Sequence, residues 1–245
     1  MFQLPQLNNL DRDSKRLLHG RGGHFPELEH VVIDWFAPTL LITFYTEKVV
    51  NLQILDQLIE VATQAPEVDA IVVQERHQPR APKRTVYGEL PGDPIARESG
   101  LRYHLNLHRN QNHGLFLDMK PGRDWIRAHA SGKRVLNLFA YTCSLSVAAI
   151  AGGAESVTNL DMASGALATG RENHRLNFDS DTCRRASYLA HDLFKSWGKL
   201  KRGNPYDVIV IDPPSNQAGS FVAEKDYAKV LRRLPDFTHS ETRIL

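Results

Sequence analysis

The segment with the clearest chemistry is residues 206–215, where an apolar run leads into Asp212, Pro213, Pro214 and Ser215. Proline fixes the backbone angle φ and lacks an N–H group, so this loop is stiff and offers a carboxylate and bare carbonyl oxygens. Such a loop can hold a planar nitrogen heterocycle or an amine by its N–H groups. Group transfer to a nitrogen held in this way depends mainly on positioning. We therefore expect these four residues to bind an acceptor, with a plain strand-ending turn as the alternative.

Two further acidic residues follow apolar runs upstream: Asp161 ends the run at 156–160, and Asp192 follows the run at 186–189. In an open sheet of parallel strands, ligands bind beyond the carboxyl ends of the strands. A carboxylate at Asp161 can accept both hydroxyl protons of a ribose, and Asp192 can reach an adenine amino group. Either acid alone could be a surface or capping residue. Their order, together with Asp212, favours a nucleoside site.

The loop at 139–144 reads Phe-Ala-Tyr-Thr-Cys-Ser and contains no glycine. A nicotinamide or flavin cofactor would require G-x-G-x-x-G, because its pyrophosphate approaches bare backbone at a helix N-terminus. S-adenosylmethionine has no phosphate and tolerates a loop without glycine. The loop therefore favours S-adenosylmethionine and makes a dinucleotide-dependent oxidoreductase the weakest alternative.

Strands and helices alternate from residue 132 onward, which is typical of a doubly wound α/β sheet. We expect strands at 135–139, 156–160, 186–189 and 207–211, and helices at 144–151, 163–177 and 224–234. A small α+β domain is expected over 31–118, with strands at 31–35, 40–45, 70–74, 101–108 and 115–119 and a helix at 51–63. Residues 1–30 are expected to be a polar, basic, loop-like extension, and 119–245 to be the cofactor-binding domain.

The composition excludes several classes of protein. The chain has two cysteines and no CxxC pattern, so we expect no metal site. It has no apolar run of about 20 residues and no signal peptide, so we expect a cytoplasmic protein without a membrane partner. The net charge is only +2, but basic residues cluster at 12–21, 76–84 and 195–202. These clusters are either solvated loops or a surface that contacts RNA phosphates.

Four segments, in order, resemble the class I methyltransferases that modify bacterial 23S ribosomal RNA, a group that includes cytosine-5 and guanine-N7 enzymes. The matching segments are Gly-Leu-Phe-Leu-Asp-Met-Lys-Pro-Gly-Arg at 114–123, Phe-Ala-Tyr-Thr at 139–142, Asn173 with Asn177, and Asp-Pro-Pro-Ser at 212–215. The resemblance covers about residues 100–235. It implies S-adenosylmethionine as the cofactor and RNA, most plausibly large-subunit ribosomal RNA, as the partner. The residues that we expect at the cofactor are Phe116, Asp118, Arg123, Asn137, Phe139, Ala140, Tyr141, Thr142, Asp161, Met162, Asp192, Leu193 and Asp212.

Three departures from the family pattern have consequences. Cys143 stands where the family usually has glycine, so a positive φ there would cost about 1 kcal/mol; we expect a loop residue and not a nucleophile. Met119 replaces a usual polar residue. Only about 30 residues follow Ser215, so we expect a C-terminally truncated sheet that lacks its fifth to seventh strands and has an unpaired edge at 207–211. The RNA-binding PUA domain of some members is also expected to be absent.

The sequence thus predicts an S-adenosylmethionine-dependent methyltransferase that acts on an RNA base. Cytosine-5 chemistry is not expected, because the family's nucleophilic cysteine would fall in the missing region. Methylation of a protein amide or a small molecule remains an alternative, and so does an inactive fragment that only binds the cofactor or RNA.

Overall fold

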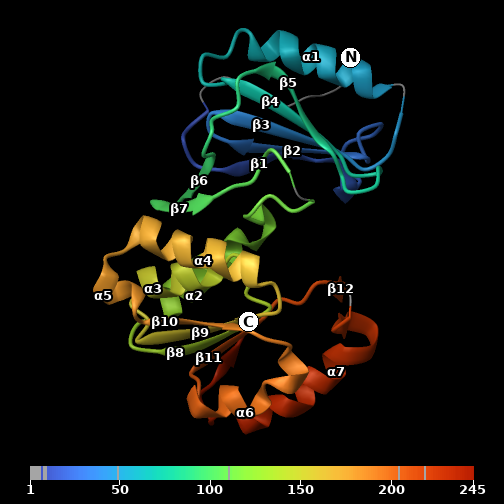
Figure 1. Ribbon diagram of the computed structural model, residues 1–245. Helices are drawn as coiled ribbons and strands as arrows, with labels where there is room; N and C mark the ends of the chain where they lie inside the picture. The colour runs from blue at the N-terminus through green and yellow to red at the C-terminus, as the bar shows by residue number, and fades with distance from the viewer. Residues whose placement is uncertain (1–6, 8–9, 49, 110, 204, 218) are drawn as a thin grey trace. The chain divides into compact units, whose positions relative to one another are not determined.

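The structure is a computed structural model that describes residues 7, 10–48, 50–109, 111–203, 205–217 and 219–245 (Figure 1). The chain forms two compact units, Met1–Asp118 and Met119–Leu245. Each unit has its own sheet and its own core, and each is described by itself.

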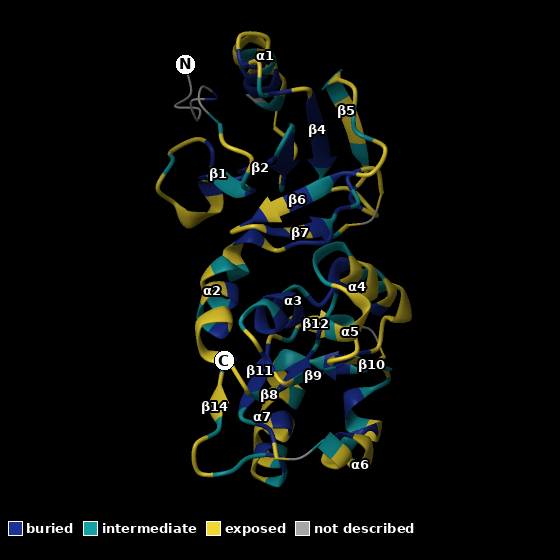
Figure 2. Cartoon of the chain, turned by 90° about the vertical axis from the view of Figure 1, so that its left-hand side faces the viewer, coloured by how far each residue is buried: buried dark blue, intermediate teal, exposed yellow. Residues whose placement is uncertain are grey.

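The first unit is built on a five-stranded sheet with the order β1-β2-β3-β4-β5. The strands are β1 (Lys15–His19), β2 (Val31–Phe36), β3 (Thr39–Phe44), β4 (Ala70–Glu75) and β5 (Lys83–Gly88). Neighbours are antiparallel except β3 and β4, which are parallel and joined through helix α1 (Val50–Ala62). Ile54 and Leu58 of α1 pack into the core of the sheet. The interior strand β4 is almost entirely buried, whereas the edge strand β5 is exposed or half-buried (Figure 2).

Three expectations for this unit are wrong. Lys15–His19 is strand β1 and not a loop; its Arg16 pairs with the buried Asp34, with 2.8 Å between Nε and Oδ1. A short, charged edge strand lacks an alternating apolar pattern, so the sequence did not indicate it. Leu117–Met119 is a 3-10 helix, η2, and the strand before it is only Leu101–His104 (β7), paired with Ile95–Glu98 (β6). Residues 1–6 and 8–9 of the expected extension lie outside the described residues.

The second unit is a doubly wound sheet, as predicted. Its strands are β8 (Arg134–Leu138), β9 (Ser156–Asp161), β10 (Ala186–Ala190), β11 (Val208–Ile211) and β14 (Arg243–Ile244). They are all parallel, in the order β10-β9-β8-β11-β14. Helices α2 (Lys120–His129), α3 (Ser144–Ala151) and α4 (Ser164–Asn177) lie on one face, and α6 (Trp197–Leu200) and α7 (Ala223–Arg233) on the other (Figure 1).

Short elements complete the second unit. They are helix α5 (Ser180–Cys183), the hairpin of β12 (Asn216–Gln217) and β13 (Phe221–Val222), and the 3-10 helices η3 (Leu193–Lys195), η4 (Lys201–Gly203) and η5 (Leu234–Asp236). The first unit also has the 3-10 helix η1 (Gly20–Gly22).

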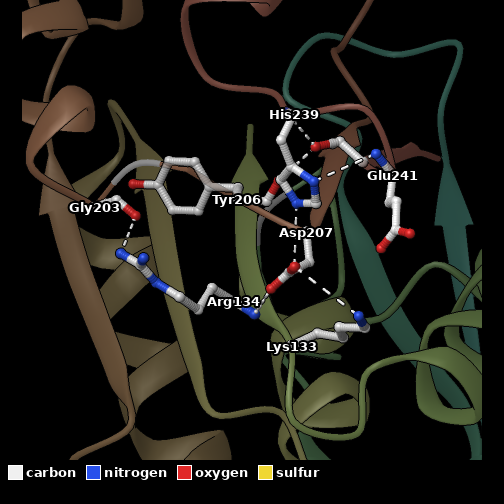
Figure 3. Close-up of polar contacts among 8 residues, drawn as sticks. Lys133, Arg134, Gly203, Tyr206, Asp207, His239 and Glu241 are labelled. Atoms are coloured by element: carbon white, nitrogen blue, oxygen red, sulfur yellow. Dashed lines mark hydrogen bonds and ion pairs between the residues drawn. The ribbon is translucent and has the colours of Figure 1, made fainter.

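The expectation that β11 is an unpaired edge is also wrong, because β14 pairs with it at the end of the chain. Asp207 fixes this end (Figure 3): its Oδ2 accepts a hydrogen bond from the backbone N of Arg134 at 2.7 Å, and its Oδ1 lies 3.2 Å from Nε2 of His239. Nδ1 of His239 accepts from the backbone N of Glu241, so Nε2 carries the proton and donates. Partial burial opposes ionisation, but these hydrogen bonds lower the pKa of Asp207.

We expect Asp207→Ala to detach this end of the chain from the sheet. Hydrogen bonds to a charged group contribute about 1.5–3 kcal/mol each. The amides of Arg243 and Leu245 donate to O of Asp207 and to O of Ile209. In the variant these two amides should exchange hydrogen at least tenfold faster at neutral pH. Because the folded pKa of Asp207 is lowered, its stabilisation is present above the unfolded value of about 3.9 and is lost as the pH falls through the folded value. Unchanged exchange at Leu245 would contradict this role. The matched control is Asp181→Ala, which removes a carboxylate that is 83% exposed.

Candidate cofactor and acceptor site

The carboxyl ends of three adjacent strands carry the residues that the sequence singled out. Strand β8 lies between β9 and β11, and the chain leaves β8 to form one half of the sheet and returns beside it to form the other. The Phe-Ala-Tyr-Thr loop follows β8, Asp161 is the last residue of β9, and Asp212 directly follows β11. The structure therefore brings these segments to the point in an open α/β sheet where ligands bind.

Asp161 holds the loop after β8 in place. Its Oδ2 accepts a hydrogen bond from the backbone N of Tyr141 at 2.8 Å, and its Oδ1 accepts one from the backbone N of Ala163 at 2.8 Å. Each carboxylate oxygen has a second acceptor position, so both oxygens can still accept from the two hydroxyls of a ribose. Asp161 is 8% exposed. The donor set at this position fits a nucleoside.

The backbone of the loop suits a ligand without phosphate. The N–H of Ala140 donates to O of Leu160, that of Tyr141 to Asp161, and that of Cys143 to O of Ala140. These three donors are turned to partners within the protein. A pyrophosphate needs backbone N–H groups directed at it, so this loop disfavours a dinucleotide for a second reason beyond its lack of glycine.

Cys143 lies in the left-handed region with a φ of 60°, as do Phe139 at 57° and Tyr141 at 47°. The position thus has the positive φ for which glycine is suited, and the cysteine carries the expected strain. Cys143 is fully buried, and burial, together with the charge of Asp161, raises the pKa of its thiol well above the usual value. The thiol is therefore neutral, which agrees with a packing role.

A chain of hydrogen bonds runs beneath this loop in a single direction. Nδ2 of Asn137 donates to Oδ1 of Asn159 at 3.0 Å, and Nδ2 of Asn159 donates to Oγ of Ser146 at 3.0 Å. Oγ of Ser146 lies 3.0 Å from Nε2 of His174, whose Nδ1 lies 2.8 Å from O of Gly170. A carbonyl can only accept, so Nδ1 carries the proton and Nε2 accepts from Ser146. This arrangement requires a neutral ring, and burial lowers the pKa of His174.

Neighbouring contacts attach the loop to helix α4. Nδ2 of Asn173 donates to O of Thr142 at 2.9 Å, and both residues are buried. Gly170 lies one turn earlier on α4, and a Cβ there would be 2.5 Å from Sγ of Cys143. Only a glycine allows the helix to approach the loop this closely.

The remaining predicted cofactor residues are distributed as follows. Asn137 is 1% exposed and belongs to the hydrogen-bond chain, and Leu193 packs in the core. Oδ1 of Asp192 accepts from the backbone N of Phe194, and Met162 is 38% exposed. Phe116 and Asp118 belong to the first unit, whereas Arg123 is a buried residue of α2. Cofactor contact by these residues stays a prediction.

The loop at 212–215, which we call the acceptor loop after its predicted role, is connected through an aromatic contact to the loop at 139–142, the predicted cofactor loop. Asp212, Pro214 and Ser215 are exposed, and Pro213 is half-buried. The hairpin β12–β13 follows them and buries Phe221, whose ring meets that of Phe139 edge-on, with 4.8 Å between centroids. The two loops therefore share one packed contact.

Sequence reasoning missed the residues that support the site. These are Asn159, Ser146, His174, Gly170 and Phe221. A glycine in mid-helix and polar residues within an apolar strand and an apolar helix were available signals, since each is costly without a local reason. Nothing in the sequence paired them with one another.

The comparisons with known proteins agree with this geometry. Residues 15–245 match the family model described as S-adenosylmethionine-dependent methyltransferase. The chain belongs to this family. It is 32% identical over 216 residues to a ribosomal RNA large subunit methyltransferase of Deinococcus radiodurans, which covers 84% of the chain and 51% of that relative. The chain thus spans about half the length of that curated protein.

Two solved structures share the fold of the chain over 96% of its length. One is a "putative sam-dependent methyltransferase from Streptococcus mutans", with a TM-score of 0.78, 29% identity and 59% of that chain covered. The other is a "putative methyltransferase complexed with SAH", with a TM-score of 0.79, 29% identity and 60% covered. The second shows a relative with the demethylated cofactor bound.

The described residues contain no group of three or more His, Cys, Asp or Glu side chains arranged to hold a metal ion. They also contain no helix that is both long and apolar enough to cross a membrane.

We expect Asp161→Asn to weaken binding of S-adenosylmethionine at least tenfold, measured by calorimetric titration. Both oxygens of Asp161 accept from backbone N–H groups. An amide NH2 in place of either oxygen would face a backbone N–H, so two donors would meet and neither would have an acceptor. Asp179→Asn is the matched control, because Asp179 also accepts from a backbone N–H but asparagine caps a helix equally well. Unchanged affinity in Asp161→Asn would refute the role of this carboxylate.

We expect Gly170→Ala to displace the loop and raise the Kd for S-adenosylmethionine about tenfold, since overpacking costs about 1–3 kcal/mol. Gly165→Ala in the same helix is the control, because a Cβ there has no atom within 4 Å among the described residues. The double variant Cys143→Gly/Gly170→Ala should recover affinity, because the nearest remaining atom is then C of Thr142 at 3.2 Å. Wild-type affinity in Gly170→Ala alone would show that the close approach does not control the loop.

Proposed function

We propose that the chain transfers the methyl group of S-adenosylmethionine to a base of ribosomal RNA, most plausibly of the large subunit. The observation that carries the proposal is the exposed Asp-Pro-Pro-Ser loop beside the cofactor loop, at the carboxyl edge of β8 and β11. Membership of the methyltransferase family and the name of the Deinococcus relative support it. A cytoplasmic location belongs to the same proposal.

The residues of the site have distinct roles in this reaction. When bound, S-adenosylmethionine supplies an electrophilic methyl on a sulfonium. Asp161 would hold the ribose, the 139–142 loop would line the cofactor, and Asp192 would approach the adenine. Asp212 and the carbonyl oxygens before the two prolines would accept hydrogen bonds from the N–H groups of the base. The protein then contributes orientation and exclusion of competing poses, which is the main requirement of an in-line displacement.

A base inside a duplex cannot reach such a loop, so the target would be in a single-stranded region or flipped out. Transfer to a protein amide or a small molecule is the alternative. Incubation with S-adenosylmethionine carrying a radiolabelled methyl group, ribosomal RNA and total protein separates them. Label in RNA that nuclease digestion resolves to one nucleoside supports the proposal. Label in protein alone, or cofactor binding without transfer, contradicts it.

Asp212→Ala should lower the rate of methyl transfer at least a hundredfold while changing the Kd for S-adenosylmethionine by less than about fivefold. The carboxylate is exposed at the end of β11 and would contact the acceptor more than the cofactor. Rates come from single-turnover transfer of label, and the Kd from calorimetry. Glu224→Ala is the control, since that carboxylate lies on α7 and is exposed. Equal losses of rate and affinity in Asp212→Ala would refute the acceptor role.

A further inference from the structure

Two basic segments that are far apart in the sequence meet at one aromatic ring in the first unit. The guanidinium carbon of Arg21 lies 4.2 Å from the centroid of the Tyr45 ring, and that of Arg76 lies 5.7 Å from it. The two positive charges are therefore no more than about 10 Å apart, which is close to the Debye length of about 8 Å at physiological salt. Arg21 and Arg76 come from two of the three basic clusters in the sequence, and with Tyr45 we call them the arginine–tyrosine cluster.

The backbone holds the cluster in place. The backbone N of Tyr45 donates to O of His30, and that of Arg76 donates to O of Phe44, so both residues continue the hydrogen bonding of the sheet. Arg21 lies in η1, where Gly20 is required because a Cβ there would be 1.7 Å from O of Leu28. Nη2 of Arg76 is also 3.5 Å from Oδ1 of Asn112. The fold thus sets the backbone positions of both arginines.

The arginines of the cluster have no ion-pair partner within the part of the chain that the structure describes. No carboxylate there forms an ion pair with Arg21 or Arg76. Nζ of Lys83 adds to their positive charge and is held by O of Asn106 at 2.8 Å and O of Arg109 at 3.2 Å, both of which are uncharged acceptors. Burial and the charge of Arg76 lower the pKa of Lys83 to about 8. An anion beside these groups would relieve their mutual repulsion.

The chemistry of the cluster suits a phosphodiester. A guanidinium stacked on an aromatic face keeps its N–H edge directed outward, and that edge matches two phosphate oxygens. Such charge-assisted pairs are short and about twice as strong as neutral hydrogen bonds. Tyr45 serves here as a platform that orients the guanidinium groups.

We propose that the arginine–tyrosine cluster binds the phosphate backbone of the RNA substrate at a second site, distinct from the Asp-Pro-Pro-Ser loop. This inference rests on the proposed function for the identity of the ligand as RNA. It gives the first unit a direct part in holding the substrate.

The test measures binding of the whole chain to a fluorescein-labelled, 20-nucleotide single-stranded RNA by anisotropy between 50 and 200 mM KCl. Each phosphate contact on a single strand contributes about 0.7 to the slope of log K against log salt, so Arg21→Ala/Arg76→Ala should reduce the slope by about 1.4. It should also weaken binding roughly tenfold at the lowest salt. Arg184→Ala/Arg232→Ala is the control: it removes the same charge from exposed positions of the second unit and should leave the slope unchanged.

Further variants separate the phosphate contact from general charge and from misfolding. Tyr45→Phe keeps the ring and should bind RNA as the wild type does, whereas Tyr45→Leu should lose several-fold in affinity. Arg21→Lys/Arg76→Lys retains the charge but loses the planar fork, so affinity should fall several-fold. If the double alanine variant does not fold, Arg21→Lys/Arg76→Lys replaces it in the binding measurement. Competition by inorganic phosphate at millimolar levels would identify a site for free phosphate and overturn the proposal.

The outcomes also separate this inference from the proposed function. All these variants should retain the Kd of the wild type for S-adenosylmethionine. If the chain methylates RNA but the double alanine variant keeps the affinity and slope of the wild type, the inference fails and the proposed function stands. If the chain transfers no methyl group to RNA but the variant loses RNA affinity as described, the proposed function fails and the arginine–tyrosine cluster remains a site that binds RNA phosphates. No RNA binding by the wild-type chain would overturn the inference.

Discussion

The carboxylate of Asp161 is the interaction on which the candidate site depends. Phe139, Tyr141 and Cys143 adopt left-handed backbone conformations, each of which costs an ordinary residue about 1–2 kcal/mol. The hydrogen bond that Asp161 accepts from the backbone N of Tyr141 contributes about 1.5–3 kcal/mol because the acceptor is charged. The backbone N–H groups of Ala140 and Cys143 add hydrogen bonds of about 0.5–1.5 kcal/mol each. Together these bonds contribute about 2.5–6 kcal/mol, which is comparable with a total strain of about 3–6 kcal/mol. A strained loop can therefore be the ground state, and the residue that would bind ribose is also the one that shapes the loop.

The buried hydrogen-bond chain extends this constraint into the sheet and helices. It links Asn137 on β8 to Asn159 on β9, Ser146 on α3 and His174 on α4, and every donor in it has an acceptor. A buried polar group without a partner is costly, so a change at one member would leave another unsatisfied. The chain therefore fixes how α3 and α4 lie on the two strands that carry the loop and Asp161.

Sequence reasoning predicted the second unit well, because alternating apolar strands and helices leave a strong local pattern. Ser144–Ala151 forms the helix expected after the loop, and Asp161 and Asp212 stand where their strands end. The two missed strands share a physical cause: β1 and β14 are short, charged edge strands stabilised by partners distant in sequence. Arg16 pairs with Asp34, and Arg243 is held through Asp207. Local propensity does not indicate contacts between residues that are distant in sequence. The close approach of Gly170 to Cys143 could not be predicted for the same reason.

The contact between Phe139 and Phe221 makes the cofactor and acceptor loops interdependent. Phe139 begins the cofactor loop with a positive φ, and its ring packs on the buried Phe221 of the hairpin that follows Ser215. The backbone N of Ala223, at the start of α7, donates to O of Ser215 and closes the hairpin against the acceptor loop. Prolines restrict the backbone of the acceptor loop, and positive φ angles restrict that of the cofactor loop. Two stiff loops joined by one packed contact can set the distance between a methyl donor and its acceptor without a separate closing element. Positioning of this kind is what methyl transfer requires of the protein.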